Sequence, residues 1–200
     1  LASRFVDHGW SLKKLHRLVM TSDTYRMSKE WNPAYGAQDP ENRLFWRVPY
    51  RRLEVEAIRD SMLAVSGYLN TQMYGPSMYP YVPPAALEGS SDPDKIWRTF
   101  DETDASRRTI YAFVKRSMIV PMLEVLDLCD TTKSSAKRIN TAVPTQALTL
   151  FNGEFVNRQA RHLATRLIRE AGPDRGDQIE RAYRLAFARL PTEDEQKSLL

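Results

Sequence analysis

The chain contains 200 residues, of which 42% are hydrophobic and 27% are charged, a composition that predicts a packed globular protein and excludes a disordered one. Its net charge of +4 permits acidic partners, but Lys and Arg alternate with 25 acidic residues along the chain, which argues against a dedicated nucleic-acid-binding patch. The single cysteine, Cys129, excludes an internal disulfide and a Cys-based zinc or c-type haem site, and no apolar run approaches the roughly 20 residues of a membrane-spanning helix.

Both ends of the sequence lie within helical patterns. The first residues do not form a signal peptide, and the stretch 195–200 stops inside a helical repeat. We therefore expect a single domain, 1–200, that is a fragment truncated at both ends. Its composition divides it into N-terminal helices (1–69), an irregular aromatic loop (70–106) and a C-terminal helical part (107–200).

The first helix with a clear start signal follows Ser11, a residue type that caps helix N-termini. Its apolar residues recur in steps of three and four as far as Val19. From 28 to 43 the pattern breaks into turns, and Trp31 and Tyr35 are expected to fix this loop to the core.

The best-defined helix of the chain follows Pro49 and ends near Gly67. Its apolar stripe consists of Val55, Ile58, Met62, Val65 and Leu69. The charged residues beside the stripe allow two interpretations. They form either the solvated face of an amphipathic helix or a buried or ligand-facing ionic network of Arg51, Arg52, Glu56 and Arg59.

Residues 70–106 are rich in both proline and aromatic residues, which excludes a long helix. Such a long loop is uncommon in a compact domain and is often functional. It is either a structured loop wrapped over the core or an exposed surface for a sugar ring or a proline-rich partner. The residues of this candidate aromatic surface are Tyr74, Tyr79, Tyr81 and Trp97. The acidic residues that follow, 101–104, are expected to form a solvated turn or a helix start.

The segment 107–116 contains β-branched and aromatic residues and is expected to form a short strand, although its apolar run also fits a buried helix. Basic pairs at both ends leave open a nucleic-acid-binding patch in which Tyr111 and Phe113 stack on bases. The polar stretch 127–145 is predicted to be a loop held by its own short polar side chains.

The last third of the chain carries several helix signals. Pro144 opens a helix over 144–150, Asn152 can cap the next one, and a further apolar stripe runs from Ile179. Thr192 and Glu195 match a capping box. Together the patterns predict a mainly α fold, an irregular helical bundle with a long Pro- and aromatic-rich loop and at most one short β pair.

Four strings of the sequence carry a resemblance to a known family: 10–17 (WSLKKLHR), 51–60 (RRLEVEAIRD), 107–111 (RRTIY) and 144–152 (PTQALTLFN). Their order and spacing resemble the planctomycete domain of unknown function 1553, the C-terminal domain of cytochrome-c-like surface proteins. The resemblance implies an extracytoplasmic location, in the periplasm or at the cell surface, and an association with redox proteins or polysaccharide use. It implies no catalytic residue. Members often carry a cysteine where this chain has Ser135, so no thiol role is implied here.

The sequence leaves three functions open. The first is a non-catalytic interaction or scaffold domain, without cofactor or metal in this segment, that docks on upstream domains of the same polypeptide, on another protein or on glycan. The second is an accessory or catalytic domain in polysaccharide degradation or redox chemistry, with an Arg/Glu/Asp cleft. The third, nucleic-acid binding, requires a contiguous basic face. The residues of the candidate ionic cluster are Arg51, Arg52, Glu56, Arg59, Asp60, Arg107, Arg108 and Arg138.

Overall fold

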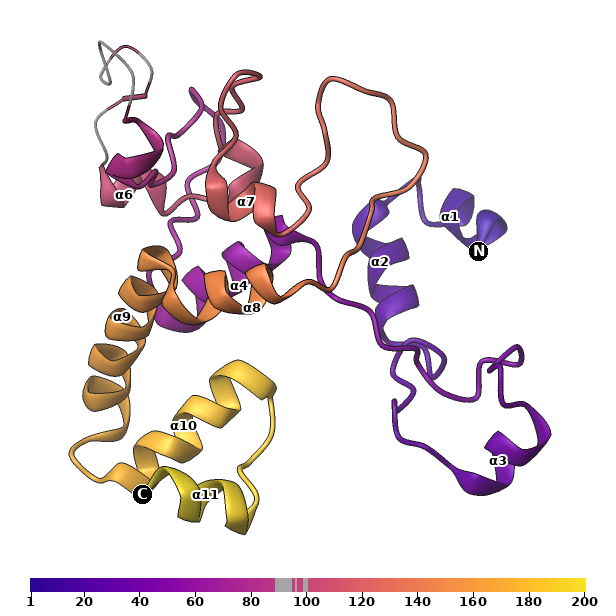
Figure 1. The fold of residues 1–200 in the computed structure, drawn as a ribbon. Coiled ribbons are helices and arrows are strands. Elements are labelled where there is room, and N and C mark those ends of the chain that lie inside the picture. The colour runs from indigo at the N-terminus through magenta and orange to yellow at the C-terminus, as the bar shows by residue number, and fades with distance from the viewer. Residues whose placement is uncertain (89–94, 96, 99–100) are drawn as a thin grey trace. The chain divides into compact units, whose positions relative to one another are not determined.

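The computed structural model describes residues 1–88, 95, 97–98 and 101–200 (Figure 1). The chain divides into two compact units, Leu1–Arg52 and Leu53–Leu200. The division falls just before the best-defined helix of the sequence. None of the helices in the described part of the chain combines the length and apolar character that a membrane crossing requires.

The first unit consists of α1 (Ala2–Asp7), α2 (Leu12–Met20) and α3 (Pro33–Gln38), joined by loops. Ser11 caps α2 as predicted, because its hydroxyl accepts a hydrogen bond from the Lys14 amide at 3.4 Å. Asn32 caps α3, its side-chain oxygen accepting from the Ala34 amide at 3.0 Å. The segment 28–43, predicted to consist of turns, therefore contains one short helix, α3.

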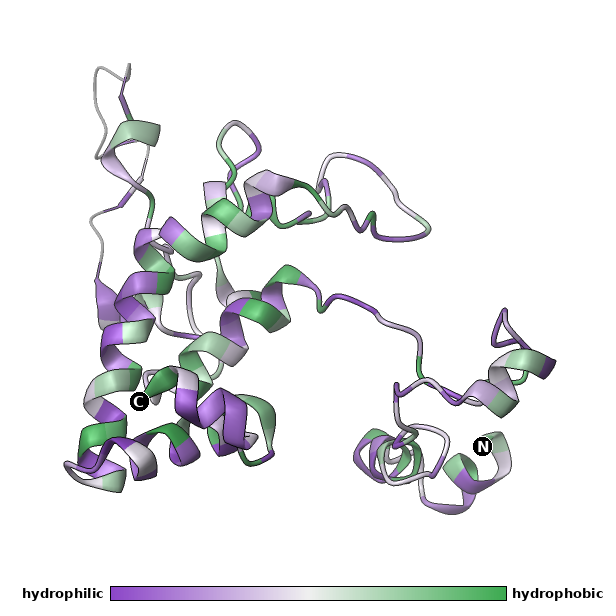
Figure 2. Ribbon diagram, turned by 60° about the horizontal axis from the view of Figure 1, so that its bottom comes forward, coloured by the Kyte–Doolittle hydropathy of each residue, from purple (hydrophilic) through white to green (hydrophobic). Residues whose placement is uncertain are grey.

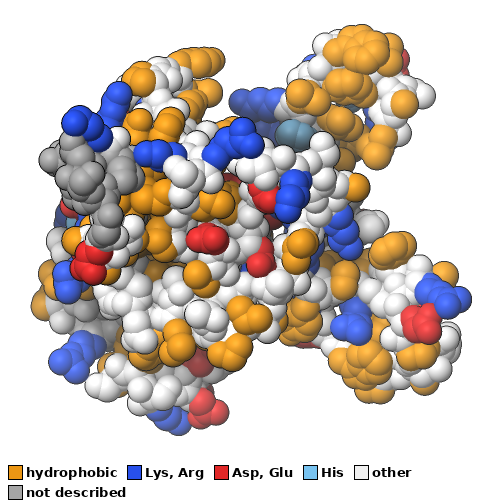
Figure 3. All heavy atoms as spheres, turned by 45° about the horizontal axis from the view of Figure 1, so that its top comes forward, with side chains coloured by type: hydrophobic (Ala, Val, Ile, Leu, Met, Phe, Trp, Pro, Cys, Tyr) orange, Lys and Arg blue, Asp and Glu red, His pale blue; other side chains and the backbone are white. Residues whose placement is uncertain are grey.

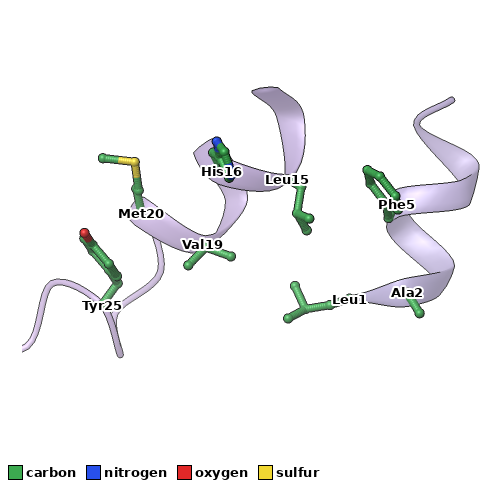
Figure 4. Close-up of a pocket in the computed structure, with 8 residues that line it drawn as sticks. All are labelled: Leu1, Ala2, Phe5, Leu15, His16, Val19, Met20 and Tyr25. Atoms are coloured by element: carbon green, nitrogen blue, oxygen red, sulfur yellow. The ribbon is translucent and has the colours of Figure 1, made fainter. Parts of the chain in front are cut away.

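Helices α1 and α2 border an open apolar cavity of about 520 Å³. Leu1, which precedes α1, and Phe5 of α1 point into the space between the helices, as do Leu15 and Val19 of α2 (Figure 4). Gly36 is the only buried residue of this unit. On the face drawn in Figure 3, hydrophobic side chains reach the surface beside Lys and Arg. The first unit thus has a thin core and exposes much of its apolar surface.

The second unit is built around α9, which packs against three other helices. Its helices are α4 (Val55–Ser66), α6 (Glu102–Ala105), α7 (Pro121–Val125), α8 (Pro144–Asn152), α9 (Glu154–Ala171), α10 (Arg175–Phe187) and α11 (Glu193–Leu199), with 3-10 turns η1 (Pro84–Ala86) and η2 (Thr109–Tyr111). Helix α9 contacts α4, α8 and α10, while α7 packs on α8 and α11 on α10. Figure 2 shows that the longer helices have a hydrophobic and a hydrophilic side. The prediction of a mainly α fold is confirmed.

The helix ends follow the sequence signals. Helix α4 stops at Ser66, short of the predicted stripe residue Leu69, because Gly67 adopts a left-handed φ of 79° that closes the helix. Thr192 and Glu195 form the predicted capping box at α11, with the Thr192 amide donating to the Glu195 carboxylate at 2.8 Å.

The core of the second unit joins α4, α7 and part of the aromatic loop. Its buried apolar residues are Val55, Val82, Trp97, Val120, Leu123 and Leu126. Two of these, Val82 and Trp97, come from 70–106. The described part of this segment is therefore anchored in the core, as the interpretation of a structured loop expects.

The strand predicted over 107–116 is wrong. Residues 109–111 form η2, and the β-type pairings of this segment are isolated bridges, such as Met78 with Ala112. The physical reason is that side chains of α4 form hydrogen bonds with backbone amides and carbonyls of this segment. Those groups are therefore not available to pair with a neighbouring strand. Asp60 accepts a hydrogen bond from the Thr109 amide at 2.7 Å, and Arg59 donates to the Arg107 carbonyl at 3.0 Å.

Candidate functional site

Arg59 is the centre of the ionic residues that the sequence singled out. It projects from α4 and is only 3% exposed. Its guanidinium donates to the carbonyls of Ala105 and Arg107 and, at 3.1 Å, to the hydroxyl of Thr109. The Phe155 ring lies 5.2 Å from the guanidinium carbon. Burial lowers the pKa of Arg59 to about 10, a direction expected for a cation surrounded mainly by neutral groups.

Asp60 completes this network from the next position of α4. Its carboxylate accepts from the Thr109 hydroxyl at 2.6 Å, so Thr109 links the Arg59 guanidinium to the Asp60 carboxylate. Arg108 approaches Asp60 from the solvent side at 3.3 Å. Arg59, Thr109 and Asp60 therefore form one chain of hydrogen bonds between α4 and η2, and Arg108 pairs with its Asp60 end. Each of these residues has a partner that stabilises the fold.

Arg107 is a second buried cation, with 2% of its surface exposed. It donates to the carbonyls of Pro76, at 2.9 Å, and Tyr74, and its guanidinium lies 4.3 Å from the centre of the Tyr111 ring. Asp104 is 3.7 Å away. Arg107 thus anchors the start of the aromatic loop to η2 by backbone contacts.

Glu56 and Arg138 form a separate pair within the predicted cluster. The guanidinium of Arg138 lies 2.7 Å from the Glu56 carboxylate and 3.7 Å from that of Glu54. Burial alone would raise the pKa of Glu56, but the hydrogen bond and charge of Arg138 outweigh it and hold the pKa below its usual 4.5. The pair ties the polar loop 127–143 to α4.

Replacing Arg138 by glutamine should raise the pKa of Glu56, because the pair favours the ionised carboxylate. The pair stabilises the wild-type fold fully above pH 4.5, and this contribution is lost as the pH falls through the lower folded-state pKa. An NMR titration of the Glu56 carboxyl carbon in both proteins measures the shift. Arg116→Gln, an exposed arginine outside the pair, is the control and should leave the Glu56 titration unchanged.

The remaining predicted residues, Arg51 and Arg52, end the first unit. Arg51 is exposed and Arg52 is half-buried. The structure therefore brings together Arg59, Asp60 and Arg108 around Thr109, places Arg107 beside them, and pairs Glu56 with Arg138. These six residues of the second unit, all of which the structure describes, are divided between the Arg59–Asp60 network and the Glu56–Arg138 pair, so they do not form one open acid–base cleft.

The four residues of the candidate aromatic surface have different environments. Tyr74 is 77% exposed, whereas Trp97 is 5% exposed and donates its indole N–H to the Pro80 carbonyl at 2.9 Å. Tyr79 stacks on Phe113 with ring centres 4.8 Å apart. Trp97 cannot belong to an exposed surface, because its indole is part of the core. The exposed-surface prediction needs correction at that residue.

Tyr81, the fourth residue, borders an apolar pocket of about 140 Å³. The pocket lies between the loop at 80–83, α7 and the first turn of α9, and is lined by Pro80, Pro83, Val120, Pro121, Met122, Val125 and Phe155, among others. Arg59 reaches its wall. We call it the α7–α9 pocket. Few of its lining side chains are polar. These are Arg59, Tyr81, Thr149 and Glu154.

A polar array continues from the rim of this pocket. The Tyr81 hydroxyl donates to Glu154, whose carboxylate also binds Arg158 at 2.8 Å. The hydrogen bond from Tyr81 lowers the pKa of Glu154. Arg158 lies 3.8 Å from Glu102 of α6, and Glu102 contacts His162 at 3.1 Å. The array therefore joins the loop at 81, α6 and α9.

Thr109, Arg158 and His162 were not among the site residues predicted from the sequence. Asp60 lies 49 positions from Thr109 and Glu102 lies 60 positions from His162, and Glu102 is also distant in sequence from Arg158, so no local spacing predicts these three contacts. Within the described part of the chain, no three His, Cys, Asp or Glu side chains gather in a metal-binding arrangement.

Comparison with protein families gives a match over the whole chain. The family model described as "PSD1: Protein of unknown function (DUF1553)" matches residues 1–200. It confirms the resemblance carried by the four strings. No curated protein and no solved structure matches the chain.

Proposed function

The chain belongs to the PSD1 family of proteins of unknown function (DUF1553), and we propose that it acts as a non-catalytic interaction domain. The observation that supports this most is the use of the buried cations. Arg59 donates to the backbone carbonyls of Ala105 and Arg107, just before η2, and Arg107 donates to those of Tyr74 and Pro76 in the aromatic loop. Residues engaged in this way maintain the fold and are poorly placed to act as acid, base or electrophile.

The α7–α9 pocket supports a binding role. An apolar cavity of about 150 Å³ in another protein stays dry and accepts benzene, so a pocket of about 140 Å³ is large enough for one ring or one branched side chain. Burying such a group on a partner would supply binding energy without chemistry. We propose that an apolar side chain of a protein partner occupies this pocket, the first candidate being another domain of the same polypeptide.

The resemblance supports two further parts of the proposal. We propose that the domain lies in the periplasm or at the cell surface, beside cytochrome-c-like domains, and that it has no cofactor of its own. The alternative is a catalytic role in polysaccharide degradation or redox chemistry. The array of Tyr81, Glu154 and Arg158 is the feature that would favour it, because it combines a carboxylate and a phenol beside a pocket.

The proposal is tested by titrating the chain with N-acetyl-phenylalaninamide and N-acetyl-leucinamide, following the methionine methyl signals by NMR. We expect a saturable shift of Met122, which lines the pocket, with affinity in about the millimolar range, and no shift of Met62, which lines a different groove. Val125→Phe fills the pocket and should abolish the shift. Val65→Phe makes the same change outside the pocket and should preserve it.

A second measurement decides against the catalytic alternative. The chain incubated with chromogenic aryl glycosides and aryl esters should release no product above the buffer rate. Turnover that disappears in Glu154→Gln would overturn the non-catalytic proposal, and a Met122 signal that is unaffected by either amide would remove the pocket as its binding site.

A further inference from the structure

The first unit carries an aromatic cluster that the sequence did not single out as a whole. Trp31 and Trp46 meet edge to face with ring centres 5.3 Å apart, and Tyr35 lies 6.0 Å from Trp46. The guanidinium carbon of Arg47 is 5.1 Å from the Trp31 ring and 5.2 Å from the Trp46 ring. We call these four residues the Trp–Arg platform.

The platform is held by its own loop. Trp46 donates its indole N–H to the Asp39 carbonyl at 2.8 Å, and Asn42 brackets the Arg47 backbone with bonds of 2.8 and 3.2 Å. Gly36 allows the close approach of Trp31, because a Cβ there would lie 2.2 Å from the indole. Trp31 and Tyr35 are nevertheless 56% and 54% exposed. The rings are thus fixed in place, with Trp31 and Tyr35 open to solvent and Trp46 half-buried, as in a preorganised binding surface.

Arg47 differs from the buried arginines of the second unit. Its guanidinium forms no hydrogen bond or ion pair with any residue that the structure describes, and its Nε is buried without a partner. An arginine is charged at all physiological pH values and binds carboxylates and sulfate-type oxyanions through its planar fork. The platform therefore combines exposed aromatic surface with one cation that lacks an anionic partner.

The net charge of the first unit also favours an anionic partner. The first unit, 1–52, holds ten Lys and Arg against five Asp and Glu, so it carries a net charge of +5, while the second unit carries −1. The even spread that the whole-chain composition suggested conceals this asymmetry. An anionic partner is attracted to the first unit specifically.

We propose that the Trp–Arg platform binds an acidic sugar ring of an anionic polysaccharide. The apolar face of the ring lies on the exposed aromatic side chains, and its carboxylate or sulfate ester pairs with Arg47. A nucleic-acid strand fits less well. It presents a phosphate at each nucleotide, whereas the neighbouring Arg43 is already paired with Glu41 at 2.7 Å and the Asp39 carboxylate lies in the same loop.

The test is affinity electrophoresis and calorimetry of the intact chain with polygalacturonate, dextran sulfate, neutral dextran and a single-stranded oligothymidylate. We expect binding to an acidic polysaccharide but not to neutral dextran. Comparing polygalacturonate with dextran sulfate shows whether the platform prefers a carboxylate or a sulfate ester. Arg47→Met should weaken this binding about tenfold or more, and Tyr35→Ala should weaken it while leaving the helical circular dichroism unchanged.

The matched control is Arg26→Met, which removes the same charge from an exposed position in the same unit and should weaken binding less than twofold. Equal losses for Arg47→Met and Arg26→Met would reduce the effect to net charge and overturn the site. So would tighter binding of the oligothymidylate than of both polysaccharides, or no binding in any arm. The α7–α9 pocket takes no part in this binding. A failure of the polysaccharide experiment therefore does not bear on the proposed binding of an apolar side chain, which the amide titration tests separately.

Discussion

Replacing Arg59 by alanine should lower the free energy of unfolding by about 3–5 kcal/mol. The substitution leaves the carbonyls of Ala105 and Arg107 and the hydroxyl of Thr109 without their buried donor. Each unsatisfied buried polar group costs about 1–3 kcal/mol. Part of this loss is offset, because the charged form of Arg59 is itself disfavoured by burial. Urea unfolding followed by circular dichroism measures the change.

Two further variants separate charge from volume. Arg59→Met keeps most of the side-chain volume but has no donor, so it should still lose about 2 kcal/mol or more. Arg116→Ala removes an exposed arginine and should stay within about 0.5 kcal/mol of wild type. A fully stable Arg59→Met protein would contradict the structural role of the guanidinium and reopen the case for a functional one.

Replacing Trp97 by alanine should lower the free energy of unfolding by about 3–5 kcal/mol, the range for removing a large aromatic side chain from a core. Trp97 packs edge to face on Tyr79 at 5.2 Å and closes the core against Val55 and Leu123. Its hydrogen bond to the Pro80 carbonyl is lost as well. The shift of the urea midpoint gives the loss.

Tyr74→Ala is the matched control for Trp97. Tyr74 belongs to the same predicted aromatic surface but is 77% exposed, so its removal should change the stability by about 0.5 kcal/mol or less. If both variants lost equal stability, the contrast between a core and a surface aromatic residue in this loop would be wrong.

The helices were predictable because their signals are local. Ser11, Gly67 and the Thr192–Glu195 capping box each act within one helical turn, and the structure places a helix end at each. The exposure of the loop aromatics was not predictable in the same way. Tyr74 and Trp97 both lie in the Pro- and aromatic-rich stretch 70–106, and only the packing of Trp97 into the core with residues of α4 and α7 decides which of them is buried.

The site shows the same limit. The sequence marked Arg59 and Asp60 as unusual, but the group that links them, Thr109, lies 49 positions after Asp60. The short apolar run 109–114 favoured a strand by composition. In the structure, side chains of α4 form hydrogen bonds with backbone groups of this segment, in place of a neighbouring strand. Strand propensity is a property of the local sequence and does not predict such distant contacts. The aromatic cluster of the first unit was likewise not predicted as a unit, because Trp31 and Tyr35 lie in the predicted loop 28–43, whereas Trp46 and Arg47 lie between that loop and the helix predicted after Pro49.

The reach of the Arg59 side chain has a consequence for the order of folding. Its acceptors lie 46 to 50 residues further along the chain, so a nascent polypeptide that ends before Ala105 presents α4 with a guanidinium that only water can satisfy. Helix α4 can form early, but its docking must wait for those residues to be synthesised. Ribosome-bound chains halted before and after that point should therefore differ sharply in protease resistance of the 55–66 segment.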